Sequence, residues 1–125
     1  MARILIIDDE QEFRRTVRAF LEADGHEVFE AANGVAGMEE FQNLLPELVV
    51  TDILMPHQDG IETIRQIRKI DPDVKIIAIS GGGQIAASAF LMLADESGAN
   101  RSMEKPFRRN RFMTEVNSLL PKLSK

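Results

Sequence analysis

Short apolar segments alternate along the chain with segments whose apolar residues recur every three or four positions. The clearest apolar segment is residues 48–52, LVVTD, in which two valines and a threonine are branched at Cβ. A continuous run of this kind is typical of a strand that is covered on both faces of its sheet. The same reasoning predicts strands over residues 3–8, 26–31 and 74–80, and a weaker edge strand over residues 100–104.

The segments between these strands are predicted to be helices, because most of them carry their apolar residues on one side at a helical period. Glycine or proline stands where most of them end, as expected for residues that stop a helix. The predicted helices cover residues 10–25, 33–45, 61–70, 84–94 and the segment with Phe112, Val116, Leu119 and Leu120. The second and third helices are predicted to bury Val35, Met38, Phe41, Leu44, Leu45, Ile61, Ile64, Ile67 and Ile70.

This alternation predicts right-handed crossovers and a parallel sheet with helices on both faces. We therefore expect a doubly wound α/β fold with a five-stranded parallel sheet, in the flavodoxin-like strand order 2-1-3-4-5. The 125 residues suit one domain, and no linker, repeat or low-complexity segment divides them. We expect residues 1–125 to form a single domain.

Composition excludes several classes of function. The net charge of −5 disfavours nucleic acid and acidic membranes, so no direct DNA binding is expected. The absence of cysteine excludes disulfides and thiol chemistry. No apolar stretch is long enough for a membrane span and nothing resembles a signal peptide, so we expect a cytoplasmic protein without a membrane partner.

Three carboxylates follow predicted strands, Asp8 and Asp9 after the first and Asp52 after the third. In the expected strand order these strands are neighbours, so the three acids share the crevice beyond the carboxyl ends of the sheet. Two unit charges about 4 Å apart repel by roughly 4 kcal/mol at an effective dielectric near 20. A hard divalent cation would relieve this repulsion, and Mg²⁺ prefers one or two carboxylates together with water.

The remaining strand ends supply groups that suit an anion. Ser80 closes the fourth strand with a hydroxyl and is followed by three glycines, and Lys105 closes the fifth. A cation, a hydroxyl, a metal and a carboxylate nucleophile suit phosphoryl transfer, in which charge on the transferred group must be neutralised. Asp52 is the predicted phosphoacceptor, because an aspartate can form an acyl phosphate.

Taken together, these motifs resemble the receiver domain of bacterial two-component response regulators. The resemblance covers essentially the whole chain, and its motifs are specific because each stands at its own strand end. They are the pair Asp8-Asp9, Asp52 followed by Met55-Pro56 and Gly60, Ser80 with a small residue next, and Lys105-Pro106-Phe107.

The resemblance implies that Asp52 receives its phosphoryl group from a phosphohistidine on a partner kinase. It also implies that Mg²⁺ is bound directly by Asp9, by Asp52 and by the backbone carbonyl of Leu54. Asp8 would act on the metal through water.

The resemblance further implies that Ser80 and Lys105 contact the phosphoryl oxygens and that the Lys105–Pro106 bond is cis. Two features depart from the family. Ser102 stands where the family has an aromatic residue that takes part in switching, and the 25 positions from Ser80 to Lys105 are more than in many members.

The chain resembles stand-alone receivers, because we expect residues 1–125 to leave no room for an output domain. The expected partners are a sensor histidine kinase or phosphotransfer protein and an unidentified downstream protein, reached by docking or by phosphorelay. Catalysis would be limited to the chain's own phosphorylation and dephosphorylation, so it is not expected to be an enzyme in the usual sense.

The sequence leaves three alternative functions to compare with this one. A phosphohydrolase of the haloacid dehalogenase type would have a second acid two residues after its nucleophile, where this chain has Leu54. A flavin or nucleotide binder would have a glycine- or hydroxyl-rich loop after the first strand instead of two acids. A degenerate receiver acting as a scaffold is another alternative, and Asp8 or Asp9 could also cap the first helix.

Several remaining residues have simpler interpretations. Arg108 and Arg109 belong to a basic cluster with Arg101 and Arg111 and lie near the start of the last helix, where the helix dipole disfavours cations. We hypothesise that this cluster docks an acidic surface, either on a partner or on a second copy in a homodimer through the last helix. His26 and His57 are expected to be surface loop residues, and Met92, Met103 and Met113 to fill gaps in the core.

Overall fold

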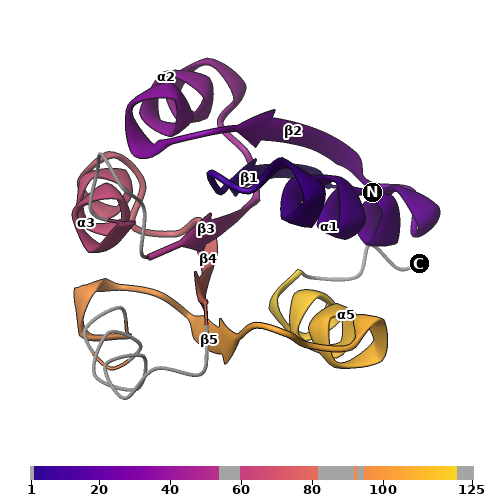
Figure 1. Ribbon diagram of the computed structural model, residues 1–125. Coiled ribbons are helices and arrows are strands. Elements are labelled where there is room, and N and C mark those ends of the chain that lie inside the picture. Colours follow the sequence, from indigo (N-terminus) through magenta and orange to yellow (C-terminus); the bar gives the residue numbers. More distant parts are fainter. Residues whose placement is uncertain (1, 54–59, 82–91, 93–94, 121–125) are drawn as a thin grey trace.

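Strands and helices alternate in the order that the sequence predicts (Figure 1). This computed structural model describes residues 2–53, 60–81, 92 and 95–120. The strands are β1 (Arg3–Ile7), β2 (Glu27–Ala31), β3 (Leu48–Asp52), β4 (Lys75–Ser80) and β5 (Arg101–Glu104). The helices are α1 (Gln11–Ala23), α2 (Gly34–Leu44), α3 (Gly60–Ile70) and α5 (Arg109–Leu119). The helix predicted over residues 84–94 falls, apart from Met92, outside the described residues.

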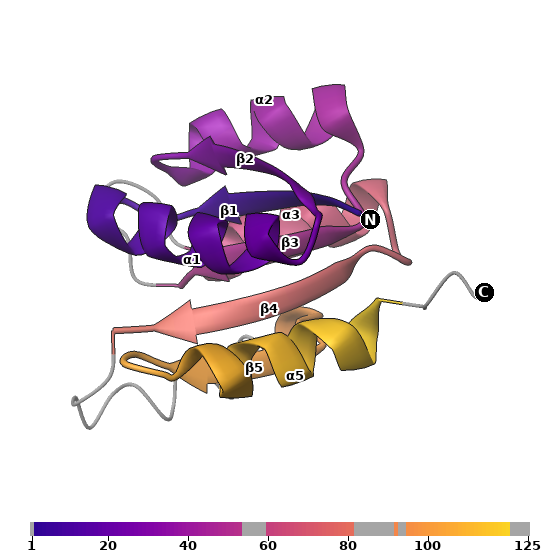
Figure 2. The same cartoon turned by 90° about the vertical axis from the view of Figure 1, so that its right-hand side faces the viewer.

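The five strands form one parallel sheet in the order β2-β1-β3-β4-β5. Figures 1 and 2 show α1 and α5 on one face of this sheet and α2 and α3 on the other. The doubly wound fold and its strand order are therefore confirmed. The predicted edge strand is also confirmed, because β5 lies at the edge of the sheet beside β4.

Each face of the sheet has its own hydrophobic core, because successive strand residues point to opposite faces. Residues such as Ile4, Ile6 and Val50 pack with α1 and α5, whereas Leu5, Ile7 and Val49 belong to the core on the side of α2 and α3. All five residues of β3 are buried, which agrees with its unbroken apolar run. This central strand carries Asp52 to the carboxyl edge of the sheet.

Some side chains predicted to be buried are exposed instead. Val35 and Leu45 are each 64% exposed, Ile70 is 45% exposed, and Met92 is 64% exposed. On α2 the buried face is formed by Gly34, Gly37 and Phe41. A Cβ on Gly37 would lie 2.5 Å from Cδ1 of Ile7, so α2 approaches the sheet along its glycines and turns Val35 outward.

The end of the sheet remote from Asp52 is held together by one arginine. Arg68 of α3 donates hydrogen bonds to the backbone oxygens of Gly98 (2.9 Å) and Val74, and to the side chain of Asn100 (2.8 Å). The same Asn100 oxygen accepts the N–H of Ile76 at 2.8 Å. These bonds join α3, β4 and the segment that leads into β5.

Candidate functional site

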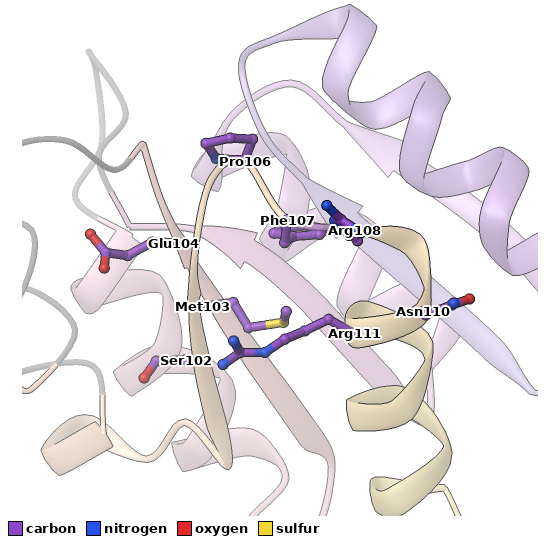
Figure 3. A pocket seen from close by; sticks show the side chains of 8 residues that line it. All are labelled: Ser102, Met103, Glu104, Pro106, Phe107, Arg108, Asn110 and Arg111. Carbon is purple, nitrogen blue, oxygen red and sulfur yellow. The ribbon is translucent and has the colours of Figure 1, made fainter.

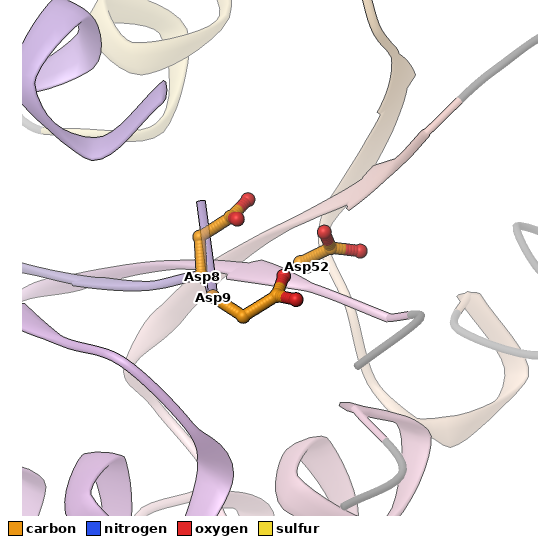
Figure 4. Close-up of side chains that lie close together, drawn as sticks. All are labelled: Asp8, Asp9 and Asp52. Carbon is orange, nitrogen blue, oxygen red and sulfur yellow. The ribbon is translucent and has the colours of Figure 1, made fainter. Parts of the chain in front are cut away.

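Three carboxylates converge at the carboxyl edge of the sheet. Asp8 and Asp9 directly follow β1, Asp52 ends β3, and the register pairs Ile7 with Thr51 in these neighbouring strands. One oxygen of each acid lies within 4.8 Å of one oxygen of each of the others. Figure 4 shows the three side chains reaching into the same region. The convergence predicted from strand order is therefore observed.

Asp8 is the most deeply placed of the three, with no solvent exposure. Its Oδ1 accepts the backbone N–H of Glu10 at 2.8 Å. Its Oδ2 accepts no well-directed hydrogen bond from any residue that the structure describes, although the ammonium of Lys105 lies 3.0 Å away. Burial raises the pKa of Asp8, and the neighbouring Asp9 adds to this, against the opposing effects of Glu10 and Lys105. A buried carboxylate oxygen that shares one lysine ammonium with two neighbouring carboxylates fits a site that takes a further cation.

Lys105 supplies the positive charge at this cluster. Its Nζ lies 2.6 Å from Oε1 of Glu10, 3.0 Å from Oδ2 of Asp8 and 3.4 Å from Oδ2 of Asp52. It also lies 4.0 Å from the centre of the Phe13 ring. Burial lowers the pKa of Lys105, but the hydrogen bond to Glu10 and the close approach to Asp8 outweigh it, so the net pKa is raised and the ammonium is retained.

Ser80 and the segment around Lys105 complete the edge of the sheet. Ser80 is fully buried at the end of β4, and its carbonyl accepts the N–H of Lys105 at 2.8 Å. The Lys105–Pro106 peptide bond is cis, as predicted. A cavity of about 510 Å³ opens beside Asp52 and is lined by Asp9, Glu10, Asp52, Gly81, Lys105 and Pro106. Leu54, Gly82 and Gly83 lie outside the described residues.

Neighbouring residues fix the backbone that carries the acids. Arg14 of α1 donates to the backbone oxygen of Asp8 at 2.6 Å and pairs with Glu30 at 2.9 Å. Gly60 begins α3 against β3, where a Cβ would lie 2.2 Å from the backbone oxygen of Asp52. The alternative that Asp8 or Asp9 is the cap of α1 is wrong, because the residue at the N-cap is Glu10.

Glu10 and Arg14 were not predicted as part of the site. Glu10 directly follows the acid pair, so the strand-end argument that selected Asp8 and Asp9 would have found it. Arg14 was less accessible to sequence reasoning, because an arginine on a helix is usually exposed. In the structure its side chain is only 13% exposed.

A second, larger groove of about 920 Å³ lies between β5 and α5 (Figure 3). It is lined by Ser102, Met103, Glu104, Pro106, Phe107, Arg108, Asn110 and Arg111. Arg101 pairs with Glu115 at 2.9 Å, and Arg109 lies 3.9 Å from Asp24. Arg108 and Arg111 form no ion pair with any other described residue, so half of the predicted basic cluster is available at the groove.

The two cavities are joined by a continuous series of contacts. Pro106 lines both of them. Phe107, which lines the groove, packs edge-on against Phe13 with ring centres 5.7 Å apart and stacks on Phe112 at 5.3 Å. Phe13 in turn lies against the ammonium of Lys105. These contacts connect Lys105, through Phe13 and Phe107, to the wall of the groove.

The chain belongs to the response regulator receiver domain family, whose model matches residues 4–117. Chemotaxis protein CheY of Thermotoga maritima is 37% identical over 118 residues, which cover 94% of this chain and 96% of that protein. The fold and site thus define a signalling module of two-component systems.

Solved structures agree with this assignment. A crystal structure of NtrX from Brucella abortus in complex with ADP has a TM-score of 0.88 at 30% identity, and the match covers 95% of this chain but 27% of that longer one. The solution structure of the beryllofluoride-activated NtrC4 receiver domain dimer has a TM-score of 0.84 at 29% identity, covering 94% of each chain. None of the helices within the described ranges combines the length and apolar character that a bilayer crossing requires.

Proposed function

We propose that this chain is a phosphorylation-dependent switch that accepts a phosphoryl group on Asp52. The donor would be a phosphohistidine of a sensor histidine kinase or of a phosphotransfer protein. The observation that carries this proposal is the convergence of Asp8, Asp9 and Asp52 within 4.8 Å, beside the ammonium of Lys105.

The acid cluster suits Mg²⁺, because its donors are carboxylates and one buried oxygen of Asp8 lacks a hydrogen-bond partner among the described residues. Asp9 and Asp52 would bind the ion directly, together with the backbone carbonyl of Leu54, and Asp8 would act through water. When bound, the ion would neutralise charge on the transferred phosphoryl group. Asp8, Asp9 and Asp52 come from two adjacent strands, so the folded sheet preorganises the site.

In the transfer step, an Asp52 oxygen forms a bond to phosphorus while the bond from phosphorus to the imidazole nitrogen breaks. The electron pair stays on the imidazole, which a proton from solvent restores to its neutral form. Lys105, 3.4 Å from Asp52, would bind a phosphoryl oxygen, and Ser80 would donate its hydroxyl to another. Both residues stabilise charge that develops on the transferred group.

Output would follow through a docking surface, which we place at the groove between β5 and α5. Arg108 and Arg111 line this groove without ion-pair partners among the described residues, so it suits an acidic protein surface. A second copy of the chain is one candidate for the protein that docks at this groove, since the net charge of the chain is −5. Ser102 lines the groove, so signalling would not depend on an aromatic side chain there; the contacts of Phe13, Phe107 and Phe112 offer another connection.

Labelling with a small phosphodonor tests the proposal. Acetyl phosphate with millimolar Mg²⁺ should add one phosphoryl group to the wild type, detected as a mass increase, and the label should disappear with a chelator. Asp52→Asn should remove the label because the nucleophilic oxygen is lost. Asp73→Asn, an exposed acid after α3, should retain it.

Three results would contradict the proposal. Label that persists in Asp52→Asn would place the phosphoacceptor elsewhere. Release of many equivalents of product from p-nitrophenyl phosphate would indicate a phosphohydrolase, and complete absence of label in the wild type would favour a scaffold.

A further inference from the structure

Glu10 makes the shortest contact of the lysine at the acid cluster. Its Oε1 lies 2.6 Å from Nζ of Lys105, compared with 3.0 Å for Asp8 and 3.4 Å for Asp52. The two residues are 95 positions apart in the sequence, so the contact exists only in the folded chain. The Glu10 side chain makes no hydrogen bond that caps α1, although it stands at the N-cap. Its carboxylate is therefore directed to Lys105 and not to the helix.

The position of Glu10 places it on the solvent side of the site. Its side chain is 64% exposed, whereas that of Asp8 is not exposed at all and that of Asp52 is 6% exposed. Lys105 thus lies between one outer carboxylate and two inner ones. The inner two belong to the cluster that would hold the cation, and all of these residues except Asp8 line the cavity of about 510 Å³.

We propose that Glu10 is a positioning residue that holds Lys105 toward the outer side of the acid cluster. The part of this proposal that concerns the phosphoryl group rests on the proposed function of the site. In the resting state Glu10 shares the ammonium with Asp8 and Asp52, so those two carboxylates hold it less tightly and a divalent cation can displace it from them. After phosphoryl transfer, the Glu10 carboxylate competes with the phosphoryl group for Lys105. Its negative charge also repels the phosphoryl group.

This arrangement has two consequences of opposite sign. Without the Glu10 carboxylate, the ammonium would pair with Asp8 and Asp52 alone and compete more strongly with the cation, so Mg²⁺ would bind more weakly. An anion bound at Asp52 would no longer compete with Glu10 for Lys105, so it would bind more tightly. A residue with a purely structural role would not strengthen one ligand while weakening the other.

Isothermal titration calorimetry of Glu10→Gln tests the proposal with two probes, Mg²⁺ alone and beryllofluoride at saturating Mg²⁺. From the usual strength of partly exposed ion pairs, we expect the Kd for Mg²⁺ to rise about two- to fivefold and the Kd for beryllofluoride to fall by a similar factor. The chain has no tryptophan, so calorimetry is preferable to intrinsic fluorescence.

Two matched variants separate contact from charge. Glu12→Gln removes an exposed charge from the first turn of α1 and should leave both Kd values unchanged. Glu10→Asp keeps the charge but shortens the side chain, and an aspartate at the N-cap bonds to the helix backbone instead. It should therefore shift both Kd values in the same directions as Glu10→Gln.

Several outcomes would overturn the role of Glu10. These are unchanged Kd values in Glu10→Gln, a shift of both in the same direction, or wild-type behaviour of Glu10→Asp. A wild type that binds Mg²⁺ but no beryllofluoride would contradict the proposed function instead, and the Mg²⁺ titrations would then decide the role of Glu10 by themselves.

Discussion

His26 lies between α1 and β2, and its ring accepts a hydrogen bond through Nδ1 from the backbone N–H of Ala2 at 3.1 Å. Burial lowers the pKa of His26 below its ordinary value of 6.5. A protonated ring would present an N–H to another N–H at this position. The sequence predicted a simple surface residue, whereas the structure shows a half-buried acceptor that favours the neutral ring.

Stability should therefore depend on pH through His26. The folded pKa lies below the unfolded one, so the unfolded chain binds the proton first and the free energy of unfolding falls as pH drops below about 6.5. In His26→Gln the amide oxygen can accept the same N–H without titrating. Urea unfolding at about pH 7.5 and about pH 5.5 should show a loss in the wild type that exceeds the loss in the variant by about 0.5–1.5 kcal/mol, the value of one hydrogen bond. Equal losses would contradict this interpretation.

At the site, the residues that sequence reasoning found are those that close a strand. Asp8, Asp9, Asp52 and Lys105 could be predicted because parallel strands bring their carboxyl ends to one edge. The contact between Lys105 and Glu10 could not be predicted, because no sequence pattern indicates which of several nearby acids a flexible lysine side chain contacts.

Helices α2 and α3 approach the sheet through glycines in two different ways. On α2, an added Cβ at Gly37 would meet the side chain of Ile7, with Cδ1 at 2.5 Å and Cγ1 at 2.9 Å. On α3, an added Cβ at Gly60 would meet backbone, with the oxygen of Asp52 at 2.2 Å and Cα of Ile53 at 2.4 Å. The buried side chain of Ile7 can give way by a small shift, whereas the backbone of β3 cannot shift without moving Asp52.

Alanine at these two positions should therefore have unequal effects. We expect Gly60→Ala to lower the free energy of unfolding by about 1–3 kcal/mol and to reduce labelling of Asp52 by acetyl phosphate. Gly37→Ala should stay within about 1 kcal/mol of the wild type, because the helix propensity of alanine offsets part of the overpacking. Urea unfolding measures both. A Gly37→Ala variant that is the less stable of the two would show that Ile7 cannot move aside.

Element boundaries and element types were mostly predictable, since periodicity and stop residues define them. The buried face of α2 was not predictable, because hydrophobicity favoured Val35 over the neighbouring glycines. Glycine allows a helix to lie close to a sheet because it has no side chain. Hydrophobicity gives glycine little weight, so it does not predict that a glycine face is the buried one.

Across the whole molecule, the chemical site and the arginine groove occupy adjoining regions connected by Lys105, Pro106 and Phe107. The two-faced architecture followed from alternation, whereas the strand order was taken from the common flavodoxin-like arrangement. The groove could not be predicted from the sequence, because its shape depends on how α5 packs beside β5. Sequence reasoning did indicate its basic character through the arginines.

Self-association provides a test of the groove. Sedimentation velocity with Mg²⁺ and beryllofluoride should show salt-sensitive dimers of the wild type. The double variant Arg108→Glu/Arg111→Glu should remain monomeric, because reversed charges repel the acidic surface of a second copy. The matched reversal Arg65→Glu/Lys69→Glu on α3, at the other face of the sheet, should still dimerise. A monomeric wild type would exclude a second copy as the occupant.

Pro106 forms part of the wall of both cavities. A compound seated against its outer side would touch neither the acid cluster nor a cation bound there, yet would press on the residue next to Lys105, which we propose binds the phosphoryl group. Inhibitors of this protein therefore need not resemble phosphate or carry the high negative charge that keeps such mimics out of cells.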